Sequence, residues 1–117
     1  MAVVNAPGNL QTAQTGNAES TNTILRSNQS APAAIRITSA VGATPTVTVN
    51  IQGSVDGTTF FNIPYALVAT PSTFVVTALT ITTAVTTFYL LQTGQAWNYV
   101  KLVMSANTNV TLTSDYF

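Results

Sequence analysis

Residues able to carry out acid–base or nucleophilic chemistry are few in this 117-residue chain. It contains no histidine and no cysteine, which excludes Ser-His-Asp and Cys-His catalysis and zinc sites built from these ligands. Its carboxylates, Glu19, Asp56 and Asp115, fall in a predicted arm, a predicted turn and the C-terminal segment. Glycosidase chemistry needs a pair of carboxyl groups, and calcium needs several oxygens close together. We therefore expect a non-enzymatic protein without a metal or other cofactor.

The three basic residues, Arg26, Arg36 and Lys101, balance the carboxylates, so the formal net charge is zero. A neutral chain has no electrostatic footprint for nucleic acid or for an anionic membrane, and neither partner is expected. Because charges are so rare, each basic side chain is a candidate for a hydrogen bond or ion pair between protomers. The alternative is a solvated surface position.

Two aromatic residues complete the candidate interface. Trp97 and Tyr99 are two positions apart and would share a face of one strand, where with Lys101 they could form a platform for sugar or protein. The interpretation we favour is that Trp97 covers one end of the core. Other aromatic residues have apolar neighbours and are predicted to lie mainly in the core: Phe60, Phe61, Phe74, Phe88 and Tyr89.

The elements that position these residues are predicted to be strands. The stretch from Thr44 to Ile63 alternates apolar and polar residues and then reaches Asp56-Gly57, a pair typical of a hairpin turn. The stretch from Trp97 to Ser105 alternates in the same way and is followed by a predicted turn at 107–109. The predicted inward residues of the two strands are Val47, Val49, Ile51, Val100, Leu102 and Met104. Further strands are predicted at 21–27, 34–40, 73–80 and 81–92, with Ile35 and Ile37 inward, Arg36 outward, a bend at 82–87 and a turn at 92–95.

Composition favours the same fold class. Charged residues make up 5% of the chain, against roughly 25% in ordinary soluble proteins, and 22 residues are threonine, which suits strands better than helices. We predict an all-β antiparallel sandwich or jelly-roll-like barrel of six to eight strands. Residues 22–117 would form its single domain, and residues 1–21, rich in Asn and Gln, an extended N-terminal arm that is disordered alone or laid against a neighbour. The N-terminus has no signal-peptide pattern, and the weakly polar run at 73–92 is too rich in threonine for a membrane helix.

Two segments, VTVNIQGSVDGTTFFNIP and the later WNYVKLVMSANTNVTLT, resemble small β-sandwich structural proteins of tailed bacteriophages that act as capsid decoration or cement proteins. The resemblance spans roughly residues 44–117. It implies a virion protein on the outer capsid surface, made in the host cytoplasm and typically a homotrimer. Such a protein binds the major capsid protein across subunit seams, and its arm reaches a neighbouring subunit. The resemblance assigns no individual ligand residue.

Other functions remain open at this stage. The hairpin followed by YVKLV is also similar to sugar-binding discoidin-like sandwiches, which are usually longer and often contain disulfides. The alternative is therefore a carbohydrate- or receptor-binding module of a tail fibre or adhesin that uses Trp97, Tyr99 and the hairpin at 54–61. A third hypothesis is a tail-tube or head-completion subunit, which would form rings or tubes instead of trimers.

Overall fold

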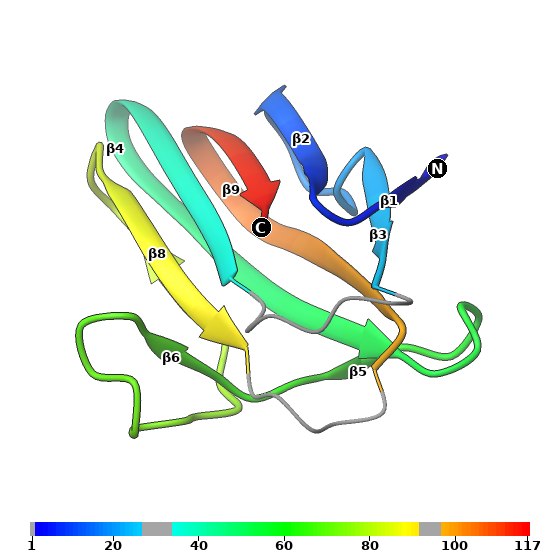
Figure 1. The fold of residues 1–117 in the computed structure, drawn as a ribbon. Coiled ribbons are helices and arrows are strands. Elements are labelled where there is room, and N and C mark those ends of the chain that lie inside the picture. The colour runs from blue at the N-terminus through cyan, green and yellow to red at the C-terminus, as the bar shows by residue number, and fades with distance from the viewer. Residues whose placement is uncertain (1, 27–33, 92–96) are drawn as a thin grey trace.

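The computed structural model describes residues 2–26, 34–91 and 97–117 (Figure 1), and the turn predicted at 92–95 lies outside this part. All regular structure within it is β, which confirms the predicted all-β sandwich-like class. The strands are β1 (Ala2–Asn5), β2 (Gly8–Gln14), β3 (Asn22–Leu25), β4 (Ala34–Ser54), β5 (Phe61–Asn62), β6 (Tyr65–Leu67), β7 (Leu79–Ile81), β8 (Thr86–Leu91) and β9 (Tyr99–Tyr116).

A ribbon of two long strands organises the sheet. β4 and β9 pair antiparallel along almost their whole length. Both change direction at the same level, where the pairing loses register and Thr44, Ala106 and Asn109 adopt positive φ angles of 43°, 51° and 54°. Figure 1 shows the ribbon folding back there. One continuous sheet thereby becomes two layers.

Each layer contains half of β4 and half of β9. In the first layer the strand order is β6-β8-β4-β9-β2, with residues 34–41 of β4 and 110–116 of β9. In the second layer, residues 46–54 of β4 and 99–105 of β9 are followed by β3 and β1, while β5 and β7 pair with the other side of β4. Only the β1–β3 pairing among these is parallel.

The core lies between the layers and follows the predicted alternation. Side chains that point inward on a strand recur every second residue, so one face of each strand is apolar. All six residues predicted inward on the two alternating strands are at most 2% exposed, as are Ile35 and Ile37. The other apolar side chains that are at most 1% exposed are Leu10, Ile24, Ile63, Ala66, Leu91, Val110, Leu112 and Tyr116.

Within the arm predicted at 1–21, the described residues 2–21 are not separate from the rest of the fold. β1 pairs with β3 and β2 pairs with β9, so this segment belongs to the sandwich. Leu10 and Gln11 are completely buried. The polar composition that suggested an unpacked arm is accommodated by long-range hydrogen bonds, such as that from Gln11 Nε2 to Ser114 Oγ at 3.2 Å.

Two local predictions are also corrected. The turn predicted at 107–109 is the bend of β9, which continues to pair with β4 because β4 bends at the same level. Within the strand predicted at 73–80, only Val75 makes a bridge, to Tyr65, before β7 begins at Leu79. The hairpin at Asp56-Gly57 is confirmed, since Gly57 has a φ of 81° and β5 pairs with β4.

The aromatic residues divide between core and surface. Tyr89 is 7% exposed, as predicted. Phe88 is 45% exposed because adjacent strand residues point to opposite faces. Phe61 is 58% exposed on the short strand β5, so its prediction as a core residue is also wrong. Phe60 and Phe74 are half-buried.

Substituting two leucines tests the position of the core. Leu102→Ala removes a fully buried side chain from the inner face of β9, and we expect the free energy of unfolding to fall by about 2–5 kcal/mol. Leu67→Ala removes the same atoms from a side chain that is 44% exposed and should cost about 1 kcal/mol or less. Urea unfolding of both variants provides the measurement. Equal losses would contradict the assignment of the core to the space between the layers.

Candidate functional site

The five candidate interface residues separate into two places. Arg36 lies on the outer face of the first layer, in register between β8 and β9. The other four residues belong to one end of the second layer, where β3 pairs with the start of β9. These four are Arg26, Trp97, Tyr99 and Lys101.

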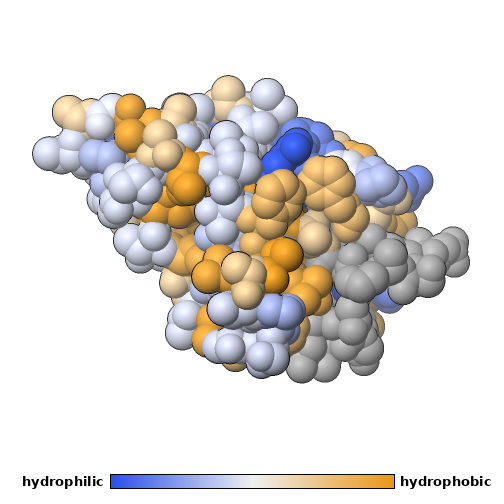
Figure 2. All heavy atoms as spheres, turned by 60° about the vertical axis from the view of Figure 1, so that its left-hand side comes forward, coloured by the Kyte–Doolittle hydropathy of each residue, from blue (hydrophilic) through white to orange (hydrophobic). Residues whose placement is uncertain are grey.

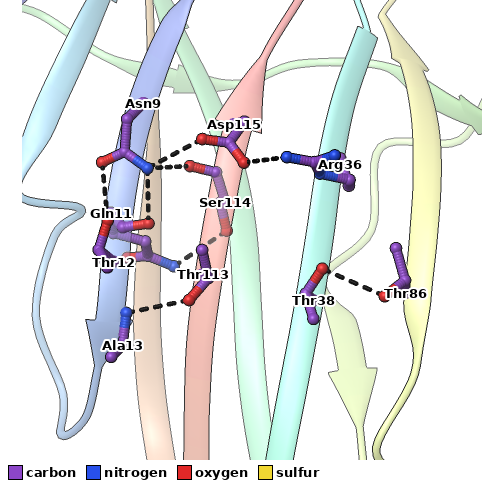
Figure 3. A network of polar contacts seen from close by, with 10 residues as sticks. All are labelled: Asn9, Gln11, Thr12, Ala13, Arg36, Thr38, Thr86, Thr113, Ser114 and Asp115. Carbon is purple, nitrogen blue, oxygen red and sulfur yellow. Dashed lines mark hydrogen bonds and ion pairs between the residues drawn. The ribbon is translucent and has the colours of Figure 1, made fainter.

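Arg36 is the centre of a group of side chains from four strand segments, which we call the Arg36 cluster: Asn9, Arg36, Phe88, Asp115 and Phe117. Register places Phe88 on one side of Arg36 and Asp115 on the other. Arg36 Nη2 donates to Asp115 Oδ2 at 2.6 Å, and Asn9 Nδ2 donates to Asp115 Oδ1 at 2.9 Å (Figure 3). The guanidinium carbon lies 5.2 Å from the ring centroid of Phe117. A carboxylate is thus held between two donors beside aromatic rings.

Arg36 and Asp115 compensate each other's charge. Partial burial by itself would raise the pKa of Asp115, but hydrogen bonds from Arg36 and Asn9, together with the charge of Arg36, hold that pKa below the usual range of an aspartate. Asp115 is therefore ionised at neutral pH and compensates the guanidinium. The side chains of Arg36 and Asp115 remain 41% and 23% exposed, so solvent reaches both.

The ammonium group of Lys101 finds its partners within its own chain. Its Nζ lies 2.8 Å from Glu19 Oε1 and 4.0 Å from the ring centroid of Phe60. The residue is only 7% exposed, although it points away from the core on β9. The carboxylate and the ring face compensate the ammonium for its loss of water. Lys101 is thus an internal anchor between the 18–20 segment and the 54–61 hairpin.

Trp97 and Tyr99 do not form an exposed platform. Trp97 packs against the core cluster, with its ring close to Gly53. The ring of Tyr99 instead lies over Gly57 in the hairpin turn. Arg26 Nη1 donates to the carbonyl oxygen of Trp97 at 2.9 Å. These contacts agree with the interpretation that Trp97 covers one end of the core.

Each of the three carboxylates has its own partners in a different part of the molecule. Glu19 pairs with Lys101 and Asp115 with Arg36. Asp56 Oδ1 accepts from the backbone N–H groups of Thr59 and Thr58, and these bonds lower the pKa of Asp56. Across residues 2–26, 34–91 and 97–117, no group of three or more acidic residues could hold a metal ion. The described geometry offers no paired carboxylates for hydrolysis.

A surface that the sequence analysis missed lies at the β6 edge of the first layer. We call it the uncharged edge and define it by Leu67, Val68, Val75 and Val76, which are 44%, 49%, 40% and 52% exposed. Two open hollows of about 380 and 400 Å³ meet at Leu67, and Figure 2 shows apolar side chains on this side of the molecule. The signal available in the sequence was the absence of any charged residue between Asp56 and Lys101.

Removing the carboxylate that pairs with Lys101 should show how much stability is lost when the buried ammonium has no counter-charge. Glu19→Gln leaves the ammonium without its carboxylate, and we expect a loss of about 1–3 kcal/mol in the free energy of unfolding. Lys101→Met keeps the side-chain volume and removes the charge, and should change stability by less than about 1 kcal/mol. Chemical denaturation compares the two. A larger loss for Lys101→Met would contradict this description.

The lowered pKa of Asp115 predicts a pH dependence. A carboxyl group whose pKa is lower in the folded state stabilises the fold above its unfolded pKa, and that contribution disappears as pH falls through the folded pKa. Asp115→Asn should therefore lose less stability than the parent between about pH 5 and pH 2. Asp56 has the same sign of shift but is present in both proteins. Parallel curves in urea unfolding over this pH range would refute the assignment.

Comparison with protein-family models, curated proteins and solved structures finds no match for this chain. Among the described residues there is no helix long and apolar enough to cross a membrane. The resemblance to decoration proteins over residues 44–117 stays a prediction, and the chain's own surfaces must support any function.

Proposed function

We propose that this protein is a non-enzymatic structural protein of a virion, a capsid decoration protein that binds as a trimer across the seams between capsid subunits. The uncharged edge is the observation that carries the proposal. Exposed apolar side chains next to a short edge strand are typical of surfaces that associate with other proteins. Covering them with a neighbouring subunit stabilises the contact by about 25 cal/mol per Å² of apolar area removed from water.

The arrangement of charges supports association by apolar contact. Arg36, Lys101 and the carboxylates of Asp115 and Glu19 are already paired inside the chain. The uncharged edge therefore meets a neighbour without like-charge repulsion and without charges that need new partners. A ligand that binds only the assembled shell stabilises it by mass action, and many copies on one particle add avidity.

The bent β4–β9 ribbon supports the role of a rigid clamp. Its strands run through both layers, so a force applied to one layer is carried into the other by the continuous backbone of β4 and β9. Residues 2–14, which were expected to reach a neighbour, are paired within this body. The proposed contact is accordingly made by the edge of the sandwich and not by an arm.

The alternative of a sugar-binding module built on Trp97, Tyr99 and the 54–61 hairpin is less well supported. Trp97 packs on the core, and Tyr99 covers the hairpin turn. The two rings therefore do not form one surface on which a sugar could stack.

Charged substitutions on the uncharged edge test the proposal. Val68→Lys with Val76→Lys should weaken co-sedimentation with expanded capsids of the same virus by at least about tenfold, because each buried ammonium must lose its hydration. Val55→Lys is the matched control, since Val55 is 55% exposed in the hairpin at another end of the molecule. It should bind like the parent.

Ionic strength provides a second criterion. Binding of the parent should persist in about 1 M NaCl, where exposed charge contacts are screened. Capsid binding that disappears in salt, or that Val68→Lys with Val76→Lys leaves intact, would contradict association through the uncharged edge.

A further inference from the structure

The Arg36 cluster is a second exposed surface with a chemistry unlike that of the uncharged edge. Its polar centre runs across three strands, from Asn9 on β2 through Asp115 on β9 to Arg36 on β4 (Figure 3). The rings of Phe117 and Phe88, which are 46% and 45% exposed, lie beside this centre.

The polar centre is fixed without any ligand. Asn9 Nδ2 donates to the backbone oxygen of Gln11 at 3.1 Å as well as to Asp115. Thr12 Oγ1 donates to Asn9 Oδ1 at 3.3 Å. These bonds hold the amide and the carboxylate in one orientation, so a ligand would not have to order them. Such pre-organisation lowers the entropic cost of binding.

The charges of the cluster select the ligand class. An anion near Arg36 would also meet the carboxylate of Asp115, and a cation near Asp115 would meet the guanidinium. A neutral ligand with donors and acceptors close together satisfies both groups, because its hydroxyls can donate to Asp115 and accept from Arg36, while the amide of Asn9 holds the carboxylate in place. The planar guanidinium of Arg36 and the planar carboxylate of Asp115 give directional, charge-assisted hydrogen bonds.

The position of the rings distinguishes this surface from a protein interface. Protein interfaces have an apolar centre and a polar rim. In the Arg36 cluster the polar groups are central, and Phe88 and Phe117 lie beside them. Small polar ligands are recognised by a few fixed polar groups next to aromatic surface.

We propose that the Arg36 cluster binds a neutral saccharide. Ring hydroxyls bond to Asp115 and Arg36, and an apolar C–H face of the sugar lies on Phe117, with Phe88 as a second ring. The inference does not depend on the decoration function. On a particle that displays many copies, weak single sites would act together through avidity.

A glycan array tests the proposal with the full chain. The array carries neutral oligosaccharides of glucose, galactose, mannose and N-acetylglucosamine beside sialylated and sulfated ones. Binding to at least one neutral probe is expected, and its Kd is then measured by NMR titration. Phe117→Ala and Arg36→Lys should each raise that Kd by at least about tenfold, because one removes the ring and the other the planar fork.

Matched controls separate recognition from folding. Phe61→Ala removes a ring that is 58% exposed on β5 and should leave the Kd unchanged. Phe117→Tyr keeps a ring and should retain binding, and all variants should melt like the parent.

Three results would overturn the saccharide site. One is the absence of binding to every neutral probe. Another is binding restricted to sialylated or sulfated probes, which would make Arg36 an anion contact. The last is neutral binding that neither Phe117→Ala nor Arg36→Lys weakens.

Discussion

The fold is built on the antiparallel pairing of β4 with β9. The two strands also share one bend, and this bend determines how the other strands are arranged. Because the strands bend at one level, their halves face each other and enclose the core. Every other strand in the described residues, apart from β1 and β6, pairs directly with this ribbon. The ribbon also sets the register that brings Arg36 opposite Asp115 across 79 positions of sequence.

The small number of charged residues links the fold to the proposed function. In an ordinary soluble protein, charges on edge strands and loops discourage association. Here the six charged residues lie outside the segment between Asp56 and Lys101, which supplies β5 to β8. The surface of that segment is left with threonine and exposed valine and leucine. A surface of this kind suits a permanent neighbour, while the Arg36–Asp115 pair offers directional hydrogen bonds on the outer face of the same layer.

The alternation of apolar and polar residues along the sequence predicted more of the fold than of the candidate site. Alternation located Val49 and Leu102 in the core because the pleat alone decides which side a strand residue faces. The integration of residues 2–14 could not be predicted, since it depends on pairing with strands far along the chain. The shared bend was also missed, because Ala106 takes a positive φ that its residue type does not suggest. Arg36 was predicted to face outward, but its partner Asp115 follows only from cross-strand register.

Hydrogen–deuterium exchange of the free and the capsid-bound protein shows whether the uncharged edge is the surface that contacts the capsid. Amide protection reports which backbone becomes covered when a partner binds. We expect new protection concentrated in β6 and the segment leading to β7, residues 65–79, with little change at the 54–61 hairpin. Protection confined to that hairpin or to β1 and β2, with residues 65–79 exchanging as in the free protein, would contradict it.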